Sequence, residues 1–100
     1  MEEIEMYRQG DVLIVTSAIP KNAEKMPHCV LVHGVATGHS HRIETGAEQY
    51  ICDNVRYVRV TDDTAQLVHE EHATIDLPKG EYAVRNQKEY SPAGNVAVID

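Results

Sequence analysis

Residues 48–61, EQYICDNVRYVRVT, carry the clearest structural pattern in the chain. Two runs rich in β-branched and aromatic residues flank Asp53-Asn54, a pair that suits a two-residue turn between strands. Strands joined by so short a turn are antiparallel neighbours. The stretch therefore predicts a β-hairpin and favours an antiparallel sheet.

Runs of the same kind, separated by glycine, proline, asparagine and aspartate, continue along the chain. No apolar stripe with the period of a helix reaches a useful length. So many short strands in 100 residues predict a single β domain, residues 1–100, built as a small antiparallel β-barrel or a two-sheet sandwich. The expected strands are Val12–Ala18, Cys29–Val35, His39–Glu44, Glu48–Cys52, Val55–Thr61, Ala65–His69, Thr74–Leu77, Glu81–Gln87 and Val96–Ile99.

Two segments interrupt this pattern. Pro78-Lys79-Gly80 combines proline and glycine as a tight reversal of the chain does. Residues Ile19 to Pro27 include two prolines and predict a loop, with one short helical turn at Asn22–Met26.

Composition narrows the classes of function. Apolar residues make up 42% of the chain but include no Phe or Trp, so the core must consist of Val, Ile, Leu, Ala and Tyr. A chain this short buries its surface only marginally, which favours a homodimer. Nine basic and sixteen acidic residues give a net charge of −7, which disfavours binding of long nucleic acid but allows a small anionic ligand in a local pocket.

The termini and cysteines indicate the compartment. The N-terminal residues MEEIEMYRQG lack the basic and apolar regions of a signal peptide, and no run is long enough to span a bilayer. We therefore expect a cytoplasmic protein with no membrane partner. Cys29 and Cys52 form no CxxC pair and are expected to be free thiols that any activity does not need.

Four of the six histidines lie in two short segments, GHSHR at 38–42 and HEEH at 69–72, with His33 just before the first. Alternate residues of a strand share one face, so His39 and His41 should present two imidazoles side by side. Gly38, next to them, allows a close backbone approach to a ligand.

The second segment has its histidines three positions apart, which differs from the HExxH motif of zinc proteases, where they are four apart. His69 and His72 lie on one side only if the backbone there forms a turn or a helix.

One hypothesis for these residues is a metal site. Imidazole and carboxylate groups suit zinc, iron, manganese or nickel. The ligands would be His39, His41 and one of His69 or His72, with Glu44 or Glu48 as an oxygen donor.

A second hypothesis is phosphodiester cleavage without a metal or other cofactor. One neutral imidazole takes the proton of a ribose 2′-hydroxyl, a protonated one supplies a proton to the leaving oxygen, and a cation stabilises the charge on phosphorus. This assigns catalytic roles to His39, His41, His69, His72 and Arg42, and ligand contacts to Gly38, Arg85, Lys88 and Tyr90. A non-catalytic binding module is the third hypothesis.

Four segments together resemble a family of small bacterial and phage proteins: RQGDVLIV (8–15), TGHSHRI (37–43), HEEHATIDLPKGEY (69–82) and QKEYSP (87–92). Some members occur beside type III CRISPR systems and look like ring nucleases, which cleave cyclic oligoadenylate. This resemblance implies a phosphodiesterase that degrades a small cyclic nucleotide ligand at a pocket formed by a symmetric dimer. The HxH pair at 39–41 also resembles, over a short stretch, the first motif of cupins, although the second cupin motif is not found.

Overall fold

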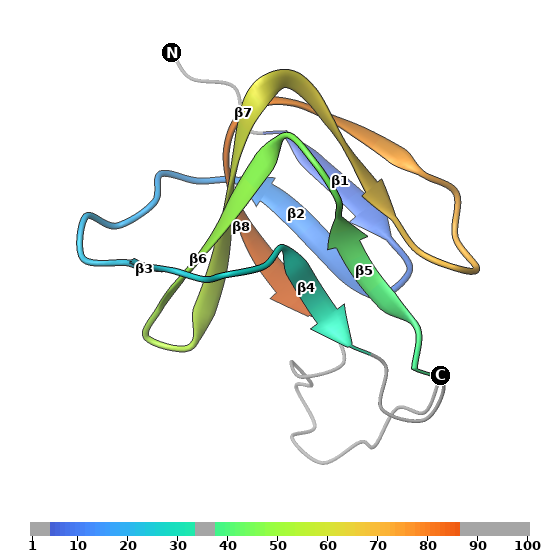
Figure 1. Ribbon diagram of the computed structural model, residues 1–100, viewed down its shortest axis with the longest axis horizontal. Coiled ribbons are helices and arrows are strands. Elements are labelled where there is room, and N and C mark those ends of the chain that lie inside the picture. The colour runs from blue at the N-terminus through green and yellow to red at the C-terminus, as the bar shows by residue number, and fades with distance from the viewer. Residues whose placement is uncertain (1–4, 34–37, 87–100) are drawn as a thin grey trace.

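The computed structural model describes residues 5–33 and 38–86, where all the regular structure is antiparallel β-sheet (Figure 1). The prediction of an all-β fold is confirmed. None of the described segments is a helix long and apolar enough to cross a membrane. The strands are β1 (Met6–Gln9), β2 (Val12–Thr16), β3 (Glu24–Lys25), β4 (Val30–His33), β5 (Ser40–Ile43), β6 (Ala47–Cys52), β7 (Val55–Val68) and β8 (Ile75–Asn86).

The strands form one sheet in the order β1-β2-β8-β7-β5-β4. The long strand β7 has two neighbours on its other edge, because its first half pairs with β6 and its last residues pair with β5. The short strand β3 extends the sheet beyond β6. Among the described residues no pairing joins β1 to β4, and this part of the sheet folds over its core as an open sheet.

A β-bulge bends the long hairpin of β7 and β8. Val60 pairs with Gly80 and Thr64 pairs with Pro78, so residues 61–63 lie opposite the single residue Lys79. An unequal count of this kind kinks a pair of strands and increases its twist. The bend lets one hairpin contribute to both halves of the folded sheet.

The reversal predicted at Pro78-Lys79-Gly80 is therefore wrong. Pro78 and Gly80 both have partners on β7, and the proline and glycine mark the bulge within a continuous strand. The chain reverses instead between Val68 and Ile75, in the loop that joins the two strands. Four predicted strands consequently merge into two.

The predicted hairpin turn at Asp53-Asn54 is confirmed, with positive φ angles of 52° and 67°. The helical turn predicted at Asn22–Met26 is wrong. Glu24 and Lys25 form β3, which pairs with β6, because the sheet edge offers backbone partners there. Strand β1 was not predicted, since MYRQ lacks the apolar alternation of a buried strand, and the strand expected at Val96–Ile99 lies outside the described residues.

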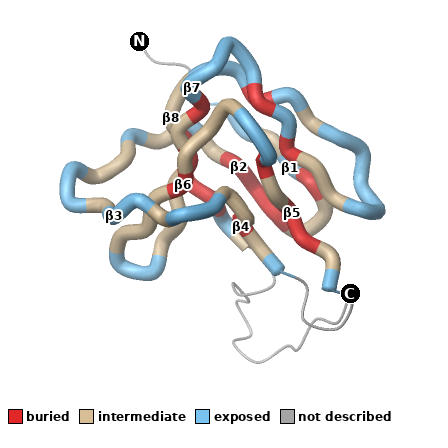
Figure 2. Tube along the Cα trace, in the orientation of Figure 1, coloured by how far each residue is buried: buried red, intermediate tan, exposed pale blue. Residues whose placement is uncertain are grey.

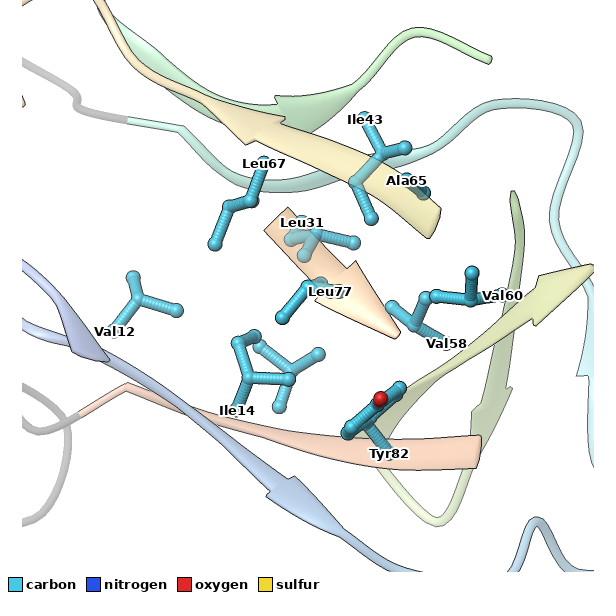
Figure 3. Close-up of a cluster of buried hydrophobic side chains, with 11 residues drawn as sticks. Val12, Ile14, Leu31, Ile43, Val58, Val60, Ala65, Leu67, Leu77 and Tyr82 are labelled. Atoms are coloured by element: carbon cyan, nitrogen blue, oxygen red, sulfur yellow. The ribbon is translucent and has the colours of Figure 1, made fainter. Parts of the chain in front are cut away.

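The core lies between the two halves of the folded sheet (Figures 2 and 3). Along β7 the buried positions change from Val58 and Val60 to Ala65 and Leu67, so the alternation shifts by one residue across the bulge. As composition predicted, no Phe or Trp contributes. The buried cluster consists of Val12, Ile14, Leu31, Ile43, Val58, Val60, Ala65, Leu67, Leu77, Tyr82 and Val84.

Candidate functional site

Four histidine rings meet beside the pairing of β5 with the end of β7, two of them from the loop between β7 and β8. The ring centroid of His69 lies 5.6 Å from that of His39, 4.2 Å from that of His41 and 4.6 Å from that of His72. The rings of His41 and His72 are stacked at 5.8 Å. We call these four residues the four-histidine cluster.

Strand pairing brings the two histidine segments together. Arg42 pairs with Val68, and Ile43 pairs with Leu67, so the residues before Arg42 lie beside those after Val68. Both histidines of the HxH segment contact the ring of His69, as expected for alternate residues on one face.

The HEEH segment forms the turn that its histidine spacing required. Residues 70–72 bend, and the backbone N–H of Glu71 donates a hydrogen bond of 3.0 Å to Nδ1 of His69. Because Nδ1 accepts this bond, the neutral His69 ring carries its proton on Nε2. Burial, followed by the neighbouring His72, lowers the pKa of His69, which favours this neutral form.

A buried glutamine holds the inner ring of the cluster. His41 is 8% exposed, and its Nδ1 lies 2.8 Å from Oε1 of Gln9, at the end of β1. The amide nitrogen of Gln9 donates to the backbone oxygens of Leu67 and Ala73, both at 2.9 Å. Oε1 must therefore be the atom that faces His41.

The ring of His72, the most exposed of the four, packs on the β1–β2 turn. A Cβ placed on Gly10, which has a φ of +61°, would lie 2.6 Å from Nε2 of His72. Glycine is thus needed at this position both for its backbone conformation and for the close approach of the ring.

Acidic side chains border the cluster. Oε1 of Glu70 accepts a hydrogen bond of 3.0 Å from the backbone N–H of Ser40, which is the main reason that the pKa of Glu70 is lowered. Oε2 of Glu70 lies 3.0 Å from a guanidinium nitrogen of Arg42. A carboxylate oxygen of Glu71 lies 3.7 Å from Nδ1 of His39.

Three of these residues have the geometry of a metal site. His39, His69 and Glu70 can each offer one ligand atom, and these atoms all lie within 4.8 Å of one another. Ligand atoms about 2.1 Å from a tetrahedral ion lie about 3.4 Å apart, so these donors would draw closer together on binding one.

The other predicted residues are placed as follows. Arg42 adjoins the cluster, but its guanidinium is engaged by Glu70 and by Ser40. Gly38, with a φ of +76°, precedes His39 in open surroundings. Arg85 is exposed on β8 opposite Leu13, and the contacts described for residues 5–33 and 38–86 do not join it to the cluster.

The remaining predicted residues lie away from the four-histidine cluster or outside the described residues. Lys88 and Tyr90 lie outside the described residues. His33 is exposed on β4, and the ring contacts do not include it. Of the predicted oxygen donors, Glu44 lies 3.6 Å from Arg42, while Glu48 pairs with Lys25 on the β3–β6 edge. The carboxylates that border the histidines are Glu70 and Glu71.

Sequence reasoning did not assign Gln9, Gly10 or Glu70 to the site. Gln9 and Gly10 belong to the segment RQGDVLIV, whose place in the motif set was the only indication of a role. Glu70 lies between the two histidines of HEEH, and its contacts with Ser40 and Arg42 identify it as a carboxylate that faces the first segment.

Comparison with known proteins identifies a family. Residues 8–87 match the family described as a domain of unknown function (DUF8820), and the chain belongs to that family. The match includes every described residue of the site. No curated protein and no solved structure matches the chain.

Proposed function

We propose that the chain is a metal-dependent hydrolase whose divalent transition-metal ion is held by His39, His69 and Glu70. The observation that carries this proposal is the grouping of their ligand atoms within 4.8 Å. Two histidines and one carboxylate form the ligand set of several catalytic zinc sites and of non-haem iron(II) sites. Such a set leaves coordination positions for water and substrate.

Local charge supports a cation at this place. Glu70 and Glu71 both border the rings, and the one arginine described beside them, Arg42, already pairs with Glu70. The lowered pKa of His69 keeps a lone pair on its ring at neutral pH. Glu70 can accept its two present hydrogen bonds and still ligate an ion, because a carboxylate has about four lone-pair directions.

Binding of an ion by His69 would break the hydrogen bond between Glu71 N–H and His69 Nδ1. His69 can ligate through Nε2 only when its proton moves to Nδ1, and ligation through Nδ1 uses the same lone pair that Glu71 N–H now occupies. Either way the Glu71 bond is replaced. The amide signal of Glu71 is therefore a direct reporter of ion binding.

The chemistry that an ion supplies here is acidification of water. The chain adds a proton acceptor, because the neutral His41 ring has its proton on Nδ1 and its lone pair on Nε2. Hydrolysis would then require that water lose one proton to His41 Nε2 while its oxygen adds to the ester centre, and that the protonated His41 return this proton to the leaving oxygen as the ester bond breaks.

Metal content tests the proposed ligand set. Protein purified without chelators and loaded with Zn²⁺ should contain stoichiometric metal by elemental analysis. His39→Ala, His69→Ala and Glu70→Gln should lose it. His28→Ala is the matched control, since His28 is exposed and its Nδ1 accepts only a local bond from Val30 N–H. Absence of bound zinc in the wild type, or full occupancy in all three variants, would refute the metal centre.

A second candidate is the metal-free phosphodiesterase that acts on a small nucleotide such as cyclic oligoadenylate. The observation that favours it is the opposite tautomers of two neighbouring rings: His41 offers a lone pair at Nε2, and His69 offers an N–H at Nε2. One ring can accept a proton while the other donates a hydrogen bond to a phosphate oxygen.

Chelation separates the two candidates. Cleavage of cyclic oligoadenylate that resists EDTA and falls by roughly 10²- to 10⁴-fold in His41→Ala supports the metal-free mechanism. Cleavage that EDTA abolishes and Zn²⁺ restores supports the metal centre. Arg42→Ala should reduce activity strongly only in the metal-free case, where a cation must balance the charge on phosphorus.

We also propose that the chain forms a homodimer and resides in the cytoplasm. Met6, on the edge strand β1, is 62% exposed, and an exposed apolar side chain on a sheet edge is compatible with a homodimer. Cys29 and Cys52 are free thiols, which suits a reducing cytoplasm. Light scattering of the purified chain tests the dimer, and a monomer mass over a broad concentration range would exclude it.

A further inference from the structure

Gln9 joins the parts of the site that lie far apart in sequence. It is the last residue of β1 and is 2% exposed. Its two amide hydrogens bond to the backbone oxygens of Leu67 and Ala73, which lie on either side of the HEEH segment. One side chain thus holds both ends of the loop that carries His69 and Glu70.

The same two bonds fix the orientation of the amide. A flipped Gln9 would place its oxygen against two carbonyl oxygens, and a buried acceptor without a donor is costly. Oε1 is consequently directed at Nδ1 of His41 at 2.8 Å, where it can only accept a hydrogen bond. In the neutral His41 ring Nδ1 must therefore carry the proton, and the lone pair is then on Nε2.

We propose that Gln9 is the positioning residue of this site, which holds His41 in the Nδ1–H tautomer and thereby presents Nε2 as the basic nitrogen. Its functional meaning rests on the proposed function, because both candidate mechanisms use the Nε2 lone pair. The tautomer itself does not depend on either mechanism. Partners of this kind commonly set the tautomer of functional histidines.

A second buried glutamine provides a matched control. Gln49 is 1% exposed, donates to the backbone oxygens of His28 and Val30, and accepts a hydrogen bond from Arg56. It makes the same kind of bonds as Gln9, but its oxygen faces an arginine on β7 in place of a histidine. Gln49→Met therefore reproduces the structural loss without touching His41.

The tautomer can be read from long-range ¹H–¹⁵N spectra of the EDTA-treated, histidine-labelled protein, recorded above the ordinary histidine pKa so that the rings are neutral. Wild type should show His41 protonated at Nδ1, with the signal assigned through His41→Gln. Gln9→Met should release the ring toward the Nε2–H form that histidine prefers in water. Gln9→Glu keeps an acceptor for His41 and should preserve the tautomer, as should Gln49→Met.

The zinc affinities of the same variants give the second measurement. Gln9→Met should bind Zn²⁺ more weakly than wild type, because it releases both ends of the loop that carries the ligands His69 and Glu70, and Gln49→Met should match wild type. An Nε2–H signal for His41 in the wild type would overturn the inference whether or not the protein folds well after substitution. A wild-type Nδ1–H signal without zinc binding would leave Gln9 in place and refute only the metal centre.

Discussion

Gly10 lies against the ring of His72 so closely that an added Cβ would be 2.6 Å from Nε2. The φ of Gly10, +61°, lies in the left-handed region. The β1–β2 turn therefore supports one wall of the four-histidine cluster, and any L residue at this position would be strained and would displace the ring of His72.

Gly10→Ala should lower the free energy of unfolding by about 1–2 kcal/mol, because an L residue is strained at this φ. It should also displace His72. The double variant with His72→Ala separates the two effects in urea denaturation: the contact part of the loss should disappear and the backbone part should remain. Equal stability of Gly10→Ala and wild type would contradict the prediction.

Ion removal should reveal unequal roles within the cluster. A ligand that binds only the folded state at a hundredfold excess over its Kd adds about 2.7 kcal/mol of stability, and so should raise Tm by roughly 10–20 °C in a domain of this size. We expect Zn²⁺ to produce this rise in wild type and in His72→Ala, and EDTA to reverse it. His69→Ala should show no rise. A rise in His69→Ala that equals that of wild type would remove His69 from the ligand set.

The Asp53-Asn54 turn offers a stabilising substitution. Both residues have positive φ, the geometry of a type I′ turn, in which glycine is preferred at the second position. Asn54→Gly should raise the free energy of unfolding by about 0.5–1 kcal/mol, and Asn54→Ala should lower it. The urea midpoints of the two variants give the answer, and a lower midpoint for Asn54→Gly would show that the side chain of Asn54 contributes more than the backbone strain costs.

Cys29 should make the stability depend on alkaline pH. Burial, and then the charge of Glu48, raise the pKa of this thiol from 9.0 to about 11. Between these values the unfolded chain loses a proton that the folded chain retains, so the stability falls as pH rises from 9 to 11. Cys29→Ser removes the titrating group and should give a shallower decline than wild type in urea denaturation across this range. Parallel curves would mean that the thiol titrates normally. Zinc content should be unchanged in this variant, because the cluster contains no cysteine.

Local chemistry made part of the fold predictable. The turn at Asp53-Asn54 depends on two residues that tolerate positive φ, so the adjoining hairpin could be recognised from a short stretch. The continuity of β8 through Pro78 and Gly80 could not be recognised in this way. Proline and glycine favour a reversal when taken alone, and only the pairing of both residues with β7 keeps the chain extended there.

The histidine site, too, has features that the sequence predicts and features that depend on how the strands pair. Sequence alone predicted a common face for His39 and His41 from strand geometry. In the structure β5 begins at Ser40, so His39 precedes the strand, and both rings contact that of His69. The contact of both rings with His69 depends on the pairing of β5 with the end of β7, which no spacing in the chain reveals. The choice of Glu70 over Glu44 as the neighbouring carboxylate likewise depends on how the HEEH turn meets Ser40.

The bulge at residues 61–63 makes the histidine site sensitive to chain length. After the bulge, Leu67 points into the core. His69 lies two residues further along the chain, just past the end of β7. Deleting one residue from 61–63 would turn Leu67 outward and carry His69 away from His41 without altering a single side chain of the cluster. Members of the family that keep all four histidines but differ in the length of this segment are therefore expected to have lost the site, whereas length changes at the Asp53-Asn54 turn leave the spacing from the bulge to His69 intact.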